Sequence, residues 1–383
     1  MTTMFHTQPI QKTSISTRQP ILKIIGLGGG GSNAVNRMIE LDLKGAEFIA
    51  ANTDMQALNQ SLAPKKICLG MRTTRGLGAG GNPTTGETAA EESFQQMCEA
   101  LRGADMVFLT AGMGGGTGTG SIPVAARAAR AVGAVTVAVV TMPFSFEVGR
   151  RQRNAREGLS KLQPHADTLI TVPNDQLLKI APPNLPLDMA FRMADDVLRQ
   201  GVQGISELIT QPGLINVDFA HIRQVMQMGG GSMLSIGIGE GPNKAIRAVE
   251  HALHHPLLES IAIDDATAIV ANFTGASDMT FMELMEAMNY LQEQTHGRAD
   301  IIPGVITDER MQDRTQVILI ITGLGATALE TRSASINVHA VPLAGRSAAP
   351  APQPHPQPAN PQEQPEMAAV DLDIPAFMRR RIR

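Results

Sequence analysis

The chain has 383 residues, 43% of them apolar, and a formal net charge of −4 at pH 7, so it is long enough for two domains and a tail. The near-balanced charge argues against a nucleic-acid-binding protein, and one tyrosine with no tryptophan argues against stacking platforms for single strands. The two cysteines, Cys68 and Cys98, lack metal-ligand spacing, which suits a reducing cytoplasm, and no metal site is expected.

The chain begins with a polar, mixed segment, residues 1–19, which is expected to be a disordered arm. A short buried strand is predicted at Ile21–Ile25. The glycine-rich run Gly26–Asn33 follows it and leads into a helix predicted from Ala34 to about Leu41. The first segment is therefore a strand, a glycine loop and a helix.

This first glycine run also fits a known dinucleotide pattern. Gly26, Gly28 and Gly31 match GxGxxG, and Asp54 stands 23 residues after Gly31, following a second predicted strand at Phe48–Asn52. An oxidoreductase with a nicotinamide or flavin cofactor is therefore one interpretation of this region.

Two more glycine loops follow the same plan. Gly76–Asn82 precedes a helix predicted near Thr85–Leu101. A buried strand at Met106–Leu109 then enters Gly112–Gly120, which holds six glycines and two threonines and leads to a helix predicted at Pro123–Ala131. Glycines that feed a helix N-terminus collect N–H donors at its positive end, which suits a phosphate, and threonine hydroxyls add further donors.

Three such loops indicate one parallel sheet with its ligand at the carboxyl ends of the strands. A dinucleotide enzyme normally needs one loop, whereas three can surround a single chain of phosphates. This favours a nucleoside triphosphate. The chain has no Gly-Lys-Ser/Thr and no Asn-Lys-x-Asp, so it is neither a Walker-type nor a Ras-like enzyme.

The rest of the chain alternates strands and helices. Further strands are predicted at Val135–Val140 and Thr168–Val172, and one long helix is predicted from Leu187 to Thr210 between two prolines. From there to about Pro342 the alternation of helix and strand continues, which indicates a second α/β domain. Residues 342–370 are proline-rich and read as a linker, and Asp371–Arg383 regains apolar residues.

These motifs carry a family resemblance. Gly114-Gly-Gly-Thr-Gly-Thr-Gly120 resembles the tubulin signature loop in the form carried by the FtsZ family of bacterial tubulin-like cell-division GTPases. Pro143-Phe-Ser-Phe-Glu147 with Arg151, the long helix and the loop Pro212–Ala220 resemble further family elements, in order from Pro20 to Arg383.

The resemblance implies an α/β fold with a parallel-sheet, Rossmann-like GTPase domain joined by a long central helix to a second, smaller α/β domain, and a disordered C-terminal linker. The implied segments are a GTP-binding domain at 20–186, the central helix at 187–212, a C-terminal domain with the catalytic loop at 213–341, the linker at 342–370 and an adaptor-binding peptide at 371–383.

The resemblance also implies the site residues. Phe191 would stack on the purine, and Asp195 would accept from the N1 and N2 donors of guanine. The implied nucleotide-binding residues are Gly29, Gly30, Gly31, Ser32, Asn33, Ala79, Gly80, Gly81, Gly114, Gly115, Gly116, Thr117, Gly118, Thr119, Glu147, Arg151, Asn174, Phe191 and Asp195. The implied catalytic residues of the loop are Asn216, Asp218 and His221, where His221 replaces an acidic residue of the family pattern.

The implied function is a cytoplasmic GTPase that binds GTP or GDP with Mg²⁺ and polymerises head to tail into the cytokinetic ring at the division site. Its implied partners are further copies of itself and division adaptors bound through Asp371–Arg383, with the membrane reached only through adaptors. Two alternatives stay open: a Rossmann oxidoreductase, and a nucleotide-binding filament that hydrolyses little because of His221. A eukaryotic-type tubulin is disfavoured by the length and the proline-rich tail.

Overall fold

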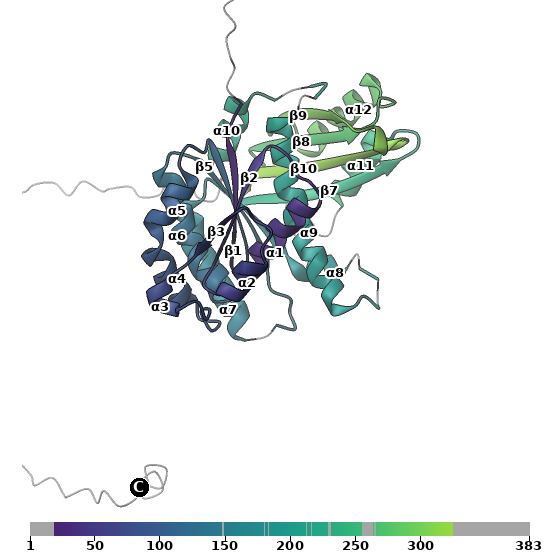
Figure 1. Cartoon of the computed structure of the whole chain (residues 1–383). Helices are drawn as coiled ribbons and strands as arrows, with labels where there is room; N and C mark the ends of the chain where they lie inside the picture. The colour runs from purple at the N-terminus through teal and green to yellow at the C-terminus, as the bar shows by residue number, and fades with distance from the viewer. Residues whose placement is uncertain are drawn as a thin grey trace, which may run out of the picture. The chain divides into compact units, whose positions relative to one another are not determined.

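The structure is a computed structural model that describes residues 19–324 except 148, 180, 183, 212, 216, 229–230, 255–262 and 264–265. Most of the expected arm, the linker and the C-terminal peptide lie outside the described residues. Within the described part the strands form one ten-stranded sheet in the order β3-β2-β1-β4-β5-β6-β7-β10-β8-β9 (Figure 1). The strands are β1 (Leu22–Leu27), β2 (Ala46–Asn52), β3 (Lys65–Cys68), β4 (Met106–Gly112), β5 (Val135–Met142), β6 (Thr168–Pro173), β7 (Gly231–Glu240), β8 (Ala268–Gly275), β9 (Asp300–Thr307) and β10 (Arg314–Leu324).

The first half of the sheet is parallel from β3 through β7. β1 lies between β2 and β4, so the chain runs outward from β1 in one direction and from β4 in the other. Parallel strands need crossover helices, and these cover both faces. The helices of this half are α1 (Gly28–Glu40), α2 (Met55–Gln60), α3 (Met71–Thr74), α4 (Pro83–Glu92), α5 (Phe94–Leu101), α6 (Thr117–Ala131), α7 (Arg150–Leu162), the 3₁₀ turn η1 (Gln163–His165) and α8 (Asn174–Leu178).

Alternate residues of β1 supply two separate apolar cores. Leu22 and Ile24 pack with α1, whereas Ile25 and Leu27 pack on the opposite face with α4 to α7. All of these side chains are at most 1% exposed. The sheet is therefore buried on both faces, as its continuous apolar strands predict.

The second half of the sheet is mixed. β10 pairs antiparallel with both β7 and β8, and β8 pairs parallel with β9. β6 meets β7 through two residue pairs, which makes the sheet continuous across both halves. The helices of this half are α9 (Leu187–Thr210), α10 (Phe219–Gln227), α11 (Lys244–Leu253), α12 (Phe281–Gln294) and the 3₁₀ turn η4 (Glu309–Met311).

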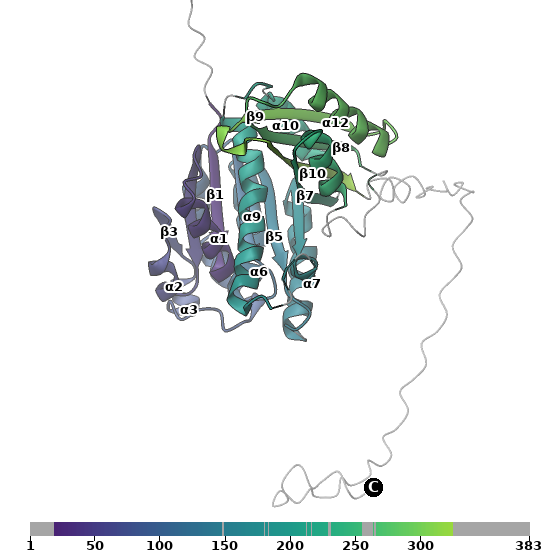
Figure 2. The same ribbon diagram turned by 90° about the vertical axis from the view of Figure 1, so that its right-hand side faces the viewer.

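α9 has the bounds predicted for the long helix, and it runs along the face of the sheet next to α1 (Figure 2). Its 24 residues give it a length of about 36 Å. Ala194 and Asp195 lie in its first turns, beside the carboxyl ends of the parallel strands. Its last residue, Thr210, contacts Gly45, which directly precedes β2. The helix therefore runs from the carboxyl ends of the parallel strands to their amino ends. Within the described residues, no helix is long and apolar enough to cross a bilayer.

The boundaries predicted for three helices are wrong. α1 begins at Gly28 instead of Ala34, α6 begins at Thr117 instead of Pro123, and the helix predicted at Thr85–Leu101 is two helices that meet at Ser93. The glycine runs continue into the helices because close packing demands the absence of a side chain there. A Cβ at Gly31 would lie 2.2 Å from the carbonyl oxygen of Thr110.

Candidate functional site

A cavity of about 380 Å³ opens at the carboxyl ends of β1 and β4, where the strand order reverses. Ligands of open α/β sheets bind at such a switch point. The lining residues come from the glycine-rich runs at α1 and α6, from the end of β5 and the segment after it, and from α7, α8 and α9: Gly29, Gly30, Asn33, Gly112, Met113, Gly115, Gly116, Thr117, Gly118, Thr141, Pro143, Glu147, Arg151, Asn174, Phe191, Ala194 and Asp195.

Two helix N-termini converge at this cavity. Gly29 and Gly30 belong to the first turn of α1, and Thr117 and Gly118 belong to the first turn of α6. The two turns touch so closely that a Cβ at Gly28, where φ is +69°, would lie 2.7 Å from the nitrogen of Gly118. Their unpaired N–H groups and helix dipoles make this end of the cavity suitable for an anion.

The two threonines of the signature loop have different surroundings. Thr117 lines the cavity, and its hydroxyl lies 2.6 Å from that of Thr53. Thr119 is 1% exposed, and its hydroxyl accepts a hydrogen bond from the N–H of Gly114 at 2.8 Å. Thr119 therefore holds the signature loop from its buried side and is not among the lining residues.

The second glycine loop, Gly76–Asn82, packs against the signature loop and is named here the phosphate loop. A Cβ at Gly116 would lie 2.8 Å from the nitrogen of Asn82 and 2.9 Å from the Cβ of Ala79. Gly80 and Gly81 both have positive φ, and a Cβ on either would meet open space. Among the described residues, no main-chain or side-chain acceptor bonds the N–H groups of Ala79, Gly80 or Gly81. These three are not lining residues, so the phosphate loop borders the cavity from outside.

The lining of the cavity also includes an aromatic ring and two polar side chains. Phe191 is 39% exposed and packs against Phe144 in a T-shaped arrangement, with ring centroids 5.4 Å apart. Asn174 is 4% exposed, and its Oδ1 has no hydrogen-bond partner among the described residues. Helical spacing alone would place Phe191 in the core, but the structure leaves its side chain partly exposed in a cavity that it lines together with the unpaired acceptor of Asn174.

Asp195 lies beside these residues on α9. Burial raises the pKa of its carboxyl to about 7, against the weaker opposing attraction of Arg37. A buried carboxyl of this kind is stabilised when a ligand supplies hydrogen-bond donors. N1–H and N2–H₂ of guanine are such donors, whereas adenine lacks that arrangement.

Glu147 and Arg151 form an ion pair at 2.9 Å at the rim, in which the Glu147 side chain is 6% exposed and the Arg151 side chain is 55% exposed. Glu147 Oε1 also accepts from the N–H of Phe144 at 3.0 Å. The buried carboxylate therefore holds the partly exposed Arg151 guanidinium at the mouth of the cavity.

The dinucleotide pattern does not correspond to a dinucleotide site. Asp54 is the N-cap of α2 and accepts hydrogen bonds from the N–H groups of Gln56 and Ala57. It is not a lining residue, so it is not placed to bind a ribose in this cavity. Gly31 and Ser32 are buried behind the first turn of α1 and are not lining residues either.

Residues 21–182 match the family model for the Tubulin/FtsZ GTPase domain, and residues 230–325 match that for the FtsZ C-terminal domain. A solved structure of FtsZ from M. jannaschii, an empty dimer, is 44% identical over 80% of this chain and 89% of that chain, with a TM-score of 0.76. The chain belongs to the Tubulin/FtsZ family. A mutant of the same M. jannaschii protein is 45% identical over 80% of this chain and 92% of that one, with a TM-score of 0.77. CetZ2 from Haloferax volcanii, in a protofilament with bound GTPγS, shares the fold at 20% identity over 82% of this chain and 97% of that one, with a TM-score of 0.69.

Membership of the FtsZ family makes this chain a guanine-nucleotide-binding, cytoskeletal GTPase. It decides against the oxidoreductase suggested by Gly26, Gly28, Gly31 and Asp54. The resemblance and the fold class predicted from the sequence are both confirmed. Five further lining residues were not among the expected site residues. Thr141 at the end of β5 and Ala194 on α9 belong to no motif, whereas Gly112, Met113 and Pro143 stand at the margins of recognised motifs.

The loop expected to be catalytic in this FtsZ-family chain does not line the cavity. Asn216 lies outside the described residues. Asp218 is the N-cap of α10, and its Oδ1 accepts from the N–H of Ala220 at 3.1 Å. His221 follows on the same helix, and its Nε2 lies 3.5 Å from Asp300 Oδ2.

This loop lies near the amino ends of the parallel strands, whereas the cavity lies at their carboxyl ends. It directly follows the last turn of α9, and α10 is joined to the amino end of β6 by a 2.6 Å hydrogen bond from the Thr168 hydroxyl to the carbonyl of Met226. The cavity borders the carboxyl ends of β1 and β4. About 22 Å of α9 therefore lies between Asp195 and the end of the helix that precedes this loop within one chain.

A second cavity of this FtsZ-family chain lies away from the glycine loops. A cavity of about 680 Å³ between α9 and the strands β7 and β10 is lined mainly by polar side chains, and no sequence motif predicted it. Among the described residues, no group of three or more His, Cys, Asp and Glu side chains is placed to hold a metal ion. Burial raises the pKa of both thiols, Cys68 and Cys98.

Proposed function

We propose that this chain polymerises head to tail in a GTP-dependent manner and that the loop at 213–221 of one copy completes hydrolysis in the cavity of the next. The position of Asp218 carries this proposal. It follows the end of α9 that lies away from the cavity, with about 22 Å of helix between the cavity residue Asp195 and Thr210, the last residue of α9. A carboxylate at that distance cannot act on a nucleotide bound in its own chain.

A second copy resolves this separation. If the loop of one copy sits over the cavity of another, the contact joins two different surfaces. Such a heterologous contact leaves the same two surfaces free at the ends of the pair, so it extends into an open filament. The dimeric solved structure of FtsZ from M. jannaschii is consistent with self-association in the family.

Within the cavity, the purine is proposed to lie between Phe191 and Asp195, with Asn33 and Asn174 as further partners for the base. The phosphates are proposed to lie against the first turns of α1 and α6 and next to the phosphate loop. Glu147 and Arg151 would contact the ribose and phosphate edge. Mg²⁺ is proposed to accompany the nucleotide, held by its phosphates, and it would screen their charge during hydrolysis.

Hydrolysis is proposed to be slower than is usual for the family because of His221. The resemblance assigns Asp218 and position 221 to the polarisation of the attacking water, together with Asn216. Asp218 already uses Oδ1 to cap α10, so its second oxygen carries this role. His221 lacks the negative charge of the usual acid and lies 3.5 Å from Asp300. Loss of one general base typically slows a step by about 10²–10⁴-fold, and Asp218 and histidine itself reduce that loss.

The decisive experiment measures phosphate release per molecule and sedimented polymer as functions of protein concentration, with GTP and Mg²⁺. Hydrolysis between copies predicts that turnover per molecule rises steeply once polymer forms. A rate per molecule that stays constant at all concentrations would rule out a catalytic loop supplied by the neighbour.

Two variants separate assembly from chemistry. Asp218→Ala should still bind GTP and sediment, with phosphate release almost abolished. His221→Asp should raise turnover without a change in polymer mass. If His221→Asp leaves the rate unchanged while Asp218→Ala abolishes it, position 221 has no catalytic share.

The cellular role is proposed from the family resemblance. It comprises formation of the cytokinetic ring in the cytoplasm at the division site, with adaptors bound through Asp371–Arg383, the membrane reached only through them, and no nucleic acid as a partner. The division of the chain into segments 20–186, 187–212 and 213–341 is part of the same proposal.

A further inference from the structure

We propose that Glu92 is a positioning residue for the phosphate loop and that it thereby sets the preference of the site for a triphosphate over a diphosphate. This inference rests on the proposed function. Because the phosphate loop borders the cavity from outside the signature loop, a terminal phosphate is the group that would reach the N–H groups of Ala79, Gly80 and Gly81. A residue that holds this loop in place acts on that phosphate and not on the base.

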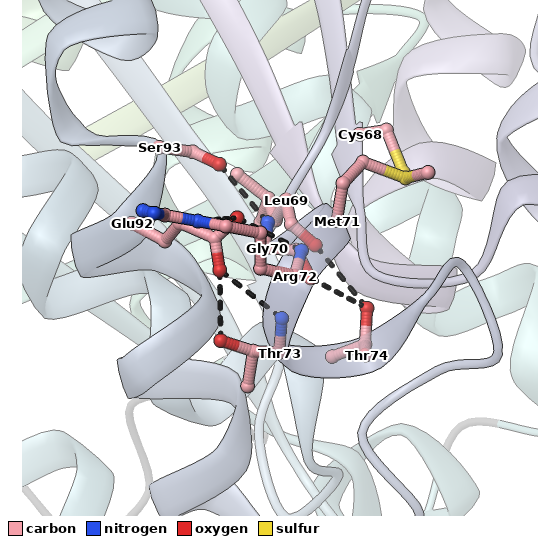
Figure 3. A network of polar contacts seen from close by, with 9 residues as sticks. All are labelled: Cys68, Leu69, Gly70, Met71, Arg72, Thr73, Thr74, Glu92 and Ser93. Carbon is pink, nitrogen blue, oxygen red and sulfur yellow. Dashed lines mark hydrogen bonds and ion pairs between the residues drawn. The ribbon is translucent and has the colours of Figure 1, made fainter.

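The Glu92 carboxylate accepts hydrogen bonds from main-chain N–H groups of the short helix α3 (Figure 3). Oε1 accepts from the N–H of Arg72 at 2.9 Å, and Oε2 accepts from the N–H and the hydroxyl of Thr73 at 3.1 and 2.8 Å. The Glu92 side chain is 16% exposed, whereas the Arg72 side chain, whose Nε lies 3.4 Å away, is 88% exposed. The sheltered contacts are therefore those to the main chain and to Thr73.

This carboxylate stays ionised at neutral pH. Hydrogen bonds, of which the bond from the Arg72 N–H is the strongest influence, lower the pKa of Glu92. Three donors meet one carboxylate, and hydrogen bonds to an ionised acceptor are stronger than those between neutral groups. Glu92 therefore keeps these hydrogen bonds to α3 throughout the pH range in which a GTPase is assayed.

A chain of hydrogen bonds leads from α3 to the phosphate loop. The Thr74 hydroxyl donates to the carbonyl of Gly70 at 3.0 Å, and the N–H of Leu77 donates to the carbonyl of Thr74 at 3.0 Å. The N–H of Gly78 donates to the carbonyl of Thr53 at 3.0 Å. The hydroxyl of the same Thr53 meets that of Thr117 at 2.6 Å, so the first half of the phosphate loop is connected to the signature helix α6.

Both ends of the phosphate loop are attached to one helix, α4. At its C-terminal end the loop passes into α4 through Asn82, whose side chain accepts from the N–H of Thr84 at 3.1 Å. At its N-terminal end it follows α3, which is held by Glu92, the last residue of α4, and by Ser93, whose hydroxyl accepts from the N–H of Gly70 at 3.0 Å.

α4 in turn is fixed to the signature helix by close backbone packing. A Cβ at Gly86 would lie 2.3 Å from the carbonyl oxygen of Gly116, and one at Gly120 would lie 2.1 Å from that of Pro83. The phosphate loop therefore spans two anchor points on a helix whose backbone is in close contact with that of α6. Of these contacts, those made by the Glu92 side chain can be removed by a single substitution.

The test compares Glu92→Gln with the matched control Glu91→Gln. Glu91 is the preceding residue on α4, and its carboxylate pairs with Arg127 at an exposed site. Binding of GDP and of a non-hydrolysable GTP analogue is measured by competition at protein concentrations below assembly, from pH 5.5 to 8. Circular dichroism and thermal unfolding show whether each variant is folded. Thr73→Val, which removes only the hydroxyl contact, is the second variant.

For Glu92→Gln we expect a loss of about tenfold in affinity for the triphosphate analogue and less than about twofold for GDP. Thr73→Val should show a smaller loss of the same kind, and Glu91→Gln should match the wild type. The ratio of the two affinities should not vary with pH, because Glu92 stays ionised. An equal loss for both nucleotides, or no loss for either, would overturn the inference alone. A wild-type protein that binds neither nucleotide would overturn the proposed function with it.

Discussion

Replacement of Asp195 by asparagine should make the nucleotide-free protein more stable while it impairs guanine binding. Burial raises the pKa of this carboxyl from 3.8 to about 7, so the folded state disfavours the ionised form. The destabilisation is absent at pH values below 3.8, grows as the pH rises toward 7, and is constant above that. Asparagine at this position carries no charge to desolvate.

The size of the effect follows from the shift. About three pKa units correspond to about 4 kcal/mol at pH 8. The carboxyl keeps some contact with solvent, and a buried amide also needs partners, so we expect a gain of about 2 kcal/mol in the free energy of unfolding for Asp195→Asn. At pH 4 the two proteins should be equally stable.

The assay is urea unfolding of nucleotide-free protein at pH 4 and pH 8, with Asp196→Asn as the control. Burial by itself would raise the pKa of Asp196. Hydrogen bonds from Arg199 and Gln200 outweigh this effect, so the pKa of Asp196 is lowered. Asp196→Asn should therefore lower the free energy of unfolding at pH 8, whereas Asp195→Asn should raise it. If Asp195→Asn is no more stable than the wild type at pH 8, the carboxyl is not desolvated and the reasoning fails.

The same variant tests base recognition. Guanine donors require the carboxylate, so the affinity of the wild type for GTP should fall as the pH drops through 7, and GTP binding at pH 7 should release up to about half a proton. Asp195→Asn should lose the preference of GTP over ATP and this pH dependence. Equal affinity of the wild type for the two nucleotides would contradict the assignment of Asp195.

Three further changes have expected outcomes. Gly120→Ala should destabilise the protein by about 2 kcal/mol or more in thermal or urea unfolding, because its Cβ would lie 2.1 Å from the Pro83 carbonyl; wild-type stability would mean that α4 can move. Phe191→Ala should weaken nucleotide binding about tenfold with little effect on stability, and Phe191→Trp should bind like the wild type; unchanged affinity in Phe191→Ala would remove the stacking role. Deletion of Asp371–Arg383 should leave GTP-driven sedimentation and phosphate release intact and abolish pull-down of division adaptors, and loss of assembly on truncation would contradict a separate role for that peptide.

The sequence allowed most strands and the long helix to be predicted because their signals are local. The buried strands are continuous apolar runs, and α9 is bounded by Pro186 before it and Pro212 beyond it. β3 was not predicted, since it is a short edge strand of four residues in which only Ile67 is buried. α3 was missed because its four residues depend on a glutamate twenty positions away.

The sequence indicated the place of the cavity through its glycine runs and the family motif. It did not indicate the roles of residues that depend on tertiary contacts. Gly29 and Gly30 at the N-terminus of α1 and Gly118 at that of α6 line the cavity. No sequence pattern distinguishes Thr117, which lines the cavity, from Thr119, which is buried behind it. That difference arises from the first turn of α6, which was expected to be loop. The same limitation applies to Glu92, whose partners become visible only in the fold.

The position of β10 within the sheet has a consequence for biosynthesis. This strand is the last that the structure describes, yet it lies between β7 and β8 and pairs with both. Until residues 314–324 leave the ribosome, β7 and β8 expose unpaired edges on the sides that β10 later occupies. Exposed strand edges are templates for aggregation, so a chain that stalls or is cut before Arg314 should be prone to aggregate even though its GTP-binding half is complete.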